Sequence, residues 1–186
     1  GYAADDIILI NIGRFAASKA QHYTIKAFAK LRPMHPKLKL LLIGNGDEKE
    51  NCMQLAKDLG VDADVNFLGF SDDIPGMFAI SDINVLTSLR EGLPRVVVEA
   101  SLCKRPTVAF EVEGLEEILR NGEVGTIVPQ HDVDALVRGI DRYLKDPELA
   151  AKHAAGAQAH ARANWDISVM VQRLREIYQR IGEKLA

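Results

Sequence analysis

The sequence predicts an α/β protein in which a Rossmann-like, doubly wound and mostly parallel six-stranded sheet is followed by C-terminal helices. Two observations lead to this fold class. Short, continuous apolar runs alternate with longer amphipathic stretches, and each interval between two such runs holds a helical pattern. Strands that are buried on both faces read as continuous apolar runs, and helical crossovers join parallel strands.

The elements follow one another in a regular order. Six runs rich in aliphatic residues are predicted as strands: Ile7–Ile12, Leu38–Ile43, Val65–Leu68, Ile83–Leu86, Thr107–Phe110 and Gly125–Val128. Helical periodicity fills the intervals at His22–Leu31, Asp47–Leu59, Ile74–Ile80, Pro94–Cys103, Leu115–Asn121 and Val133–Leu144. After Pro147 the pattern stays helical, with an Ala-rich stretch over Ala150–Ala163 and an amphipathic stretch over Ile167–Leu185.

Size and composition indicate one globular domain. The 186 residues, 47% of them hydrophobic, can bury one core and are too few for two full domains. A formal net charge of -3 provides no basic surface for nucleic acid. No apolar run approaches the roughly 20 residues that span a membrane.

The spacing of cysteines and histidines predicts no metal site. Cys52 and Cys103 lie far apart without a Cys-x-x-Cys pattern, and His153 and His160 have no carboxylates at chelating positions nearby. We therefore expect two free thiols in a reducing compartment, and so a cytoplasmic protein.

Two glutamates around one helix start are the strongest candidate site residues. Glu91 and Glu99 are eight positions apart, and Pro94 between them fits the first turn of a helix. Glu91 then belongs to the loop before this helix, and Glu99 to its second turn. A solvated loop acid and a surface helix acid remain the alternative interpretation of this pair.

The helix start is also a candidate anion site. The N–H groups of Leu93, Arg95 and Val96 are expected to be free there, and the helix dipole adds positive potential. A nucleotide-diphosphate sugar combines an anion with hydroxyl groups that two carboxylates could hold.

Cations follow the first predicted strand, at the edge where doubly wound sheets bind their ligands. Arg14 and Lys19 are five positions apart, so that both can face one loop mouth. A guanidinium fork and an ammonium suit a pyrophosphate. Two solvated surface cations are the alternative.

The loops after the second and third predicted strands lie at the same edge. Gly44-Asn-Gly46 is not a dinucleotide fingerprint, because Lys49 stands where the third glycine belongs. It is either a place where the chain passes close to a nucleotide or a plain tight turn. Phe70 either lies near a nucleobase or caps the core.

The segment from Asp82 to Ala100 resembles the donor-site motif of the retaining glycosyltransferases of family 4. In that family, two glutamates separated by seven residues follow an apolar strand that ends in Pro-Ser or Thr-Ser. Here the segment reads DINVLTSLREGLPRVVVEA and continues through SLCKRPTVA. The resemblance extends from about Ile8 to Tyr178 and covers the C-terminal, donor-binding half of the two-domain GT-B fold.

The resemblance implies that residues 1–186 form a single donor-binding domain and that the N-terminal acceptor-binding domain is absent. The intact protein would transfer a sugar from a nucleoside-diphosphate sugar to an acceptor, with retention and without a metal or other cofactor. UDP-sugar is favoured by family frequency, and this chain alone is expected to have little or no transferase activity. Nucleic acid is not an expected partner, and peripheral membrane association through the missing half stays open.

The resemblance also implies roles for the matching residues. Arg14 and Lys19 would hold the diphosphate as it leaves, Glu91 would bond the hydroxyls of the transferred sugar, and Glu99 those of the ribose. The remaining donor-binding positions are Gly13, Gly44, Gly46, Phe70, Gly92, Leu93, Pro94, Arg95 and Val96. Ala20 and Lys104 stand where the family commonly has glycine, and Ala20 is expected to shift the backbone slightly.

Two other functions remain open at this point. A noncatalytic nucleotide-sugar-binding module would need the same site without a partner domain. A nucleotide-sugar epimerase of GT-B architecture would need acid–base residues from this half.

Overall fold

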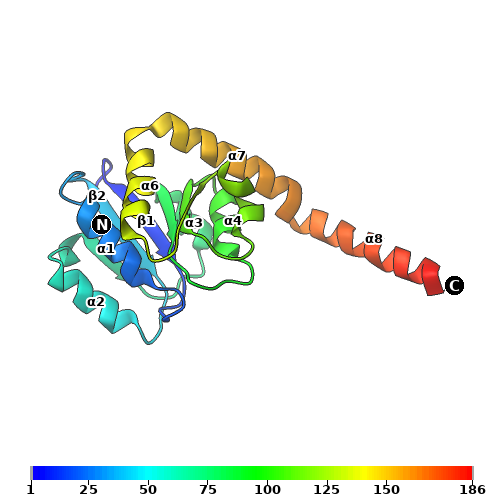
Figure 1. Cartoon of the computed structure of the whole chain (residues 1–186), viewed down its shortest axis with the longest axis horizontal. Helices are drawn as coiled ribbons and strands as arrows, with labels where there is room; N and C mark the ends of the chain where they lie inside the picture. The colour runs from blue at the N-terminus through cyan, green and yellow to red at the C-terminus, as the bar shows by residue number, and fades with distance from the viewer. Residues whose placement is uncertain (1, 186) are drawn as a thin grey trace.

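The computed structural model describes residues 2–185 and contains one parallel sheet with the strand order β3-β2-β1-β4-β5-β6 (Figure 1). Its strands are β1 (Ile7–Ile12), β2 (Leu38–Ile43), β3 (Val65–Leu68), β4 (Ile83–Leu86), β5 (Thr107–Phe110) and β6 (Thr126–Val128). All five strand pairings are parallel. The predicted fold class and all six predicted strands are therefore confirmed.

The helices are α1 (Gln21–Leu31), α2 (Lys49–Asp58), α3 (Ile74–Ala79), α4 (Arg95–Leu102), α5 (Leu115–Ile118), α6 (Val133–Lys145), α7 (Pro147–Trp165) and α8 (Ile167–Leu185). Short 3-10 turns occupy Asp62–Asp64 and Arg120–Gly122. The helix predicted over Leu115–Asn121 is wrong in its second half, because Arg120 and Asn121 adopt left-handed conformations with φ of 50° and 53°.

The helices cover both faces of the sheet, as alternation along the strands requires. On one face, Leu9 packs in a core cluster with side chains of α1, α2 and α6. On the other face, Ile8 and Ile10 pack near α3 and α4, and Ala109 packs against α4 and α5. The strand order reverses between β1 and β4, and a doubly wound sheet binds ligands at such a switch point, beyond the carboxyl ends of the strands.

Helix α8 extends away from the globular body (Figure 1). It carries a row of exposed apolar side chains at helical spacing: Ile167, Met170, Val171, Leu174, Ile177, Tyr178 and Ile181. Within residues 2–185, no helix is both long enough and apolar enough to cross a membrane. Both cysteines are free, and burial raises the pKa of Cys52 to about 11.

A buried histidine joins α7 to the rest of the domain. His153 Nδ1 lies 2.8 Å from the hydroxyl of Tyr143 on α6, and that hydroxyl accepts a hydrogen bond of 3.0 Å from Thr126 on β6. Burial lowers the pKa of His153, and Arg142 and Lys152 lower it further. The folded protein therefore favours the neutral imidazole.

We expect the domain to lose stability on mild acidification. Because the pKa of His153 is lowered by folding, the unfolded chain takes up the proton first as the pH falls below about 6.5. The melting temperature should drop between about pH 7.5 and pH 5.5, and His153→Gln should reduce that drop. His160→Gln, on the same helix, is the control. If the melting temperature of His153→Gln fell with pH as much as that of the wild type, His153 would not be the cause of the acid destabilisation.

Candidate functional site

A pocket of about 310 Å³ lies at the switch point, beyond the carboxyl ends of β1 and β4. Its lining combines the first loop with the start of α4: Ile12, Gly13, Arg14, Lys19, Glu91, Leu93, Pro94, Arg95, Val96 and Glu99. Except for Ile12, all of these were candidate residues from the sequence. The structure thus brings together the two cations and the two glutamates.

A second pocket of about 330 Å³ adjoins the first, because Ile12, Gly13 and Arg14 line both. Gly44 and Phe70 also line this second pocket, together with Ile43, Asn45, Ser71 and Ile74. Phe70 is 75% exposed, so the alternative in which it caps the core is wrong. Gly46 and Gly92 line neither pocket.

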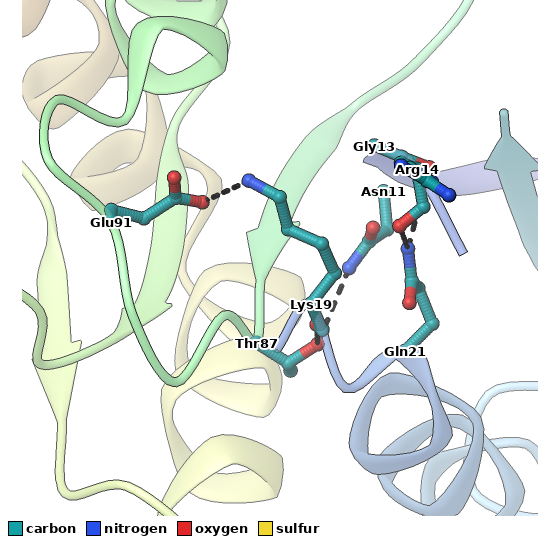
Figure 2. A network of polar contacts seen from close by, with 7 residues as sticks. All are labelled: Asn11, Gly13, Arg14, Lys19, Gln21, Thr87 and Glu91. Atoms are coloured by element: carbon teal, nitrogen blue, oxygen red, sulfur yellow. Dashed lines mark hydrogen bonds and ion pairs between the residues drawn. The ribbon is translucent and has the colours of Figure 1, made fainter. Parts of the chain in front are cut away.

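The two loops of the first pocket meet in an ion pair. Lys19 Nζ lies 2.5 Å from Glu91 Oε1, and Figure 2 shows the two side chains reaching toward each other from the loops after β1 and β4. The side chains are 29% and 11% exposed, respectively. The sequence placed both residues in one site but did not predict this direct contact.

A buried polar network lies beneath the ion pair. Asn11 Nδ2 donates to Thr24 Oγ1 at 3.0 Å, and the hydroxyls of Thr24 and Thr87 are 3.1 Å apart. Thr87 Oγ1 in turn donates to the backbone carbonyl of Lys19 at 3.2 Å (Figure 2). The network fixes the Lys19 backbone to the end of β4. The only sequence signal for it was a polar Asn11 within an aliphatic strand.

Further hydrogen bonds hold the loops in place. Gln21 Nε2 donates to the carbonyls of Arg14 at 3.0 Å and of Gly13 at 3.4 Å (Figure 2). The Arg14 side chain, by contrast, is 72% exposed and only loosely paired, 3.8 Å from Asp47. Arg14 is therefore free to turn toward a ligand in either pocket.

Backbone packing requires the two glycines of the second loop. Gly44 has φ of +140°, and a Cβ there would lie 2.1 Å from the Gly13 carbonyl oxygen. Gly46 has φ of +150°, and its Cβ would lie 2.2 Å from the carbonyl oxygen of Phe15. The second loop thus rests directly on the first, which is a structural requirement whether or not a nucleotide binds nearby.

The start of α4 differs from the prediction in two details. Pro94 is the N-cap residue, with φ of -74° and ψ of 73°, and the first helical residue is Arg95. The Arg95 N–H is not free, because it donates to the Leu93 carbonyl at 2.8 Å across this tight turn. Within residues 2–185, the N–H groups of Leu93 and Val96 have no backbone acceptor and remain candidates for an anion.

Glu99 lies on the second turn of α4, as predicted, and its side chain lines the first pocket. Partial desolvation raises the pKa of Glu99, and the Arg95 guanidinium opposes this rise. The described part of the chain contains no group of three or more His, Cys, Asp or Glu residues placed to hold a metal ion.

Ala20 and Lys104 retain the backbone that glycine would favour. Their φ angles are 48° and 57°, in the left-handed region. Ala20 therefore carries local strain, since a non-glycine residue in this region costs about 1 kcal/mol or more, and a small shift relative to a glycine-containing backbone stays a prediction.

Residues 2–160 match the family described as Glycosyl transferases group 1. The chain belongs to this family. The match covers every strand of the sheet and both pockets at its rim.

Curated relatives of this glycosyl transferases group 1 domain are longer than the chain. A putative glycosyltransferase EpsD from Bacillus subtilis is 35% identical over 152 residues, which are 82% of this chain and 40% of the relative. An alpha-D-kanosaminyltransferase from Streptomyces kanamyceticus is 30% identical over 97% of this chain and 48% of its own length. The chain thus spans less than half the length of these two relatives.

A solved structure with the same architecture contains a nucleotide. Anabaena Alr3699/HepE, in complex with UDP and glucose, superposes with a TM-score of 0.89 at 30% identity. The superposition covers 95% of this chain and 49% of the Anabaena chain.

Proposed function

We propose that this domain is the donor-binding half of a retaining, metal-independent glycosyltransferase of family 4 with GT-B architecture. Its ligand is a nucleoside-diphosphate sugar, with UDP as the favoured nucleotide. The observation that carries the proposal is the convergence of Lys19, Glu91 and the start of α4 in one pocket at the switch point of the sheet.

The two adjoining pockets suit the parts of such a donor. The nucleobase would lie against Phe70 in the second pocket, and the diphosphate would pass Gly13 and Arg14, which line both pockets. Lys19 and the N–H groups at the start of α4 would hold the diphosphate. Glu91 would then accept hydrogen bonds from the sugar, and Glu99 from the ribose.

Electrostatic stabilisation would supply the chemistry. Negative charge grows on the diphosphate as the glycosidic bond breaks, and the fixed ammonium of Lys19, the mobile guanidinium of Arg14 and the helix start oppose that charge in place of a metal. Glu91 orients the sugar in this scheme and is not a nucleophile.

The rest of the activity would belong to a longer protein. The chain spans 40% and 48% of the two relatives described above, and we assign acceptor binding to the remaining half. The exposed apolar row on α8 would pack against that half. A cytoplasmic location, with any membrane contact made by the other half, completes this proposal.

Nucleotide selectivity tests the proposal directly. Thermal unfolding should be followed in EDTA with UDP-glucose, GDP-glucose and ADP-glucose, because ligands that bind the native state raise the melting temperature. UDP-glucose is expected to give the largest rise. If none of the three ligands raised the melting temperature, donor binding would be contradicted. If GDP-glucose or ADP-glucose gave the largest rise, the preferred nucleotide would be GDP or ADP and not UDP.

Phe70→Ala should weaken nucleotide binding without loss of stability. Base stacking on an aromatic side chain contributes about 1 to 3 kcal/mol, so uridine, UMP and UDP should all bind more weakly by a similar factor. Phe70 is 75% exposed, and its removal should leave the melting temperature nearly unchanged. Calorimetry with the three ligands checks this result. If the wild type and Phe70→Ala bound each ligand with the same affinity, the nucleobase would not lie against Phe70.

A further inference from the structure

The Lys19–Glu91 pair places a negative charge inside a pocket that otherwise suits an anion. Glu91 Oε1 lies 2.5 Å from Lys19 Nζ, and the Glu91 side chain is only 11% exposed. Any phosphate that binds the same ammonium would lie within a few ångströms of this carboxylate. In such a partly buried site, the repulsion between two like charges is stronger than it is in water.

The loop that carries Glu91 is tied to its neighbours by hydrogen bonds. Leu89, two residues before Glu91, donates its N–H to the Ser18 carbonyl at 2.8 Å. Gln130 Nε2 donates to the Leu89 carbonyl at 3.0 Å. These bonds join the Glu91 loop to the Lys19 loop and to the segment after β6, and so they hold the backbones that carry the two charges close together.

The first pocket contains other charged residues, but among the described residues its ion pair joins Lys19 to Glu91. Its lining includes three cations, Arg14, Lys19 and Arg95, and two acids, Glu91 and Glu99. Of the two acids, only Glu91 forms an ion pair with Lys19 among the described residues. Arg14 is paired instead with Asp47, on the solvent side.

We propose that Glu91 acts as a charge filter that favours the glycosylated donor over the free nucleoside diphosphate. The inference rests on the proposed function. In the donor, the distal phosphate is esterified by the sugar, which also offers hydroxyl groups to the carboxylate. The free diphosphate ends in a phosphate monoester whose second ionisation lies near pH 6, so it carries about one more negative charge at neutral pH. Glu91 would therefore promote release of the product while it accepts the donor.

The test distinguishes the effect of the extra phosphate charge from the effect of the sugar hydroxyls. UDP, UDP-glucose and the β-methyl ester of UDP, which has the donor's charge without sugar hydroxyls, are titrated in EDTA into the wild-type chain and into Glu91→Gln. At about pH 7.5, the ratio of UDP affinity to methyl-ester affinity should rise about tenfold in Glu91→Gln. At about pH 5.5 the affinity ratios of the wild type and of Glu91→Gln should become more similar, because the terminal phosphate of UDP has taken up a proton.

The control is Glu116→Gln, which removes one exposed acid of α5 outside both pockets and should leave the ratio unchanged. An equal ratio in the wild type and in Glu91→Gln at both pH values would overturn the charge filter, although UDP binding would still support the proposed function. Failure of the wild type to bind any of the three ligands would overturn the proposed function itself.

The wild type also gives a test without any variant. Its ratio of UDP affinity to methyl-ester affinity should fall as the pH rises from about 5.5 to about 7.5. A rising ratio would contradict the charge filter even if Glu91→Gln failed to fold.

Discussion

Replacing Lys19 with methionine is expected to weaken UDP binding by two to three orders of magnitude. The substitution removes a charge-assisted contact worth roughly 1.5 to 3 kcal/mol. It also leaves the Glu91 carboxylate, 11% exposed, without its cation beside the bound diphosphate. The two effects add, because both disfavour the same phosphate. Calorimetry on both proteins, well below the melting temperature, measures the loss.

Two further variants show whether the loss arises in the site. Lys57→Met, on the exposed side of α2, removes the same charge at a distance and should leave UDP affinity unchanged. The double variant Lys19→Met with Glu91→Gln should recover part of the affinity, because the unpaired carboxylate is gone. If Lys57→Met lost as much affinity as Lys19→Met, net charge rather than local contact would explain the result.

Gly44→Ala is expected to cause the largest loss of stability. The residue has φ of +140°, and its new Cβ would lie 2.1 Å from the Gly13 carbonyl oxygen, so the first and second loops would have to separate. We expect a cost of about 3 kcal/mol, or a drop of about 6 to 12 °C in melting temperature for a chain of this size. UDP affinity should fall as well, because Gly13 lines both pockets.

Gly60→Ala is the matched control for this substitution. Gly60 also has a positive φ, +67°, but nothing lies within 4 Å of its Cβ position. It should therefore cost only the left-handed backbone term, about 1 kcal/mol. Equal losses in Gly44→Ala and Gly60→Ala would mean that the contact with Gly13 carries no energy of its own.

The sheet could be predicted from the sequence because its strands are buried on both faces. The runs Ile7–Ile12 and Leu38–Ile43 are aliphatic except for Asn11 and Lys39, and the structure places both strands where the pattern indicated. Helix ends were harder, since they depend on local turns. Pro94 caps α4 through a tight turn that occupies the Arg95 N–H, and periodicity contains no information about such a turn.

The candidate site followed from topology, because the carboxyl ends of parallel strands share one edge. The contacts within it could not be predicted. Thr87 reaches the Lys19 carbonyl across 68 positions of sequence, and Gln130 reaches the Leu89 carbonyl across 41. Such bonds depend on how the loops pack, which spacing along the chain does not reveal. At Ala20 the sequence showed an unusual residue, but the left-handed conformation of its backbone, with φ of 48°, is known only from the structure.

The central claim is that the rim pocket around Lys19 and Glu91 binds a nucleoside-diphosphate sugar without a metal. Calorimetric titration of UDP-glucose into this chain in EDTA tests it most directly. We expect saturable binding at one site, largely lost in Lys19→Met, retained in Lys57→Met and unchanged when magnesium replaces EDTA. Binding that appeared only with magnesium, or that survived Lys19→Met undiminished, would contradict this account.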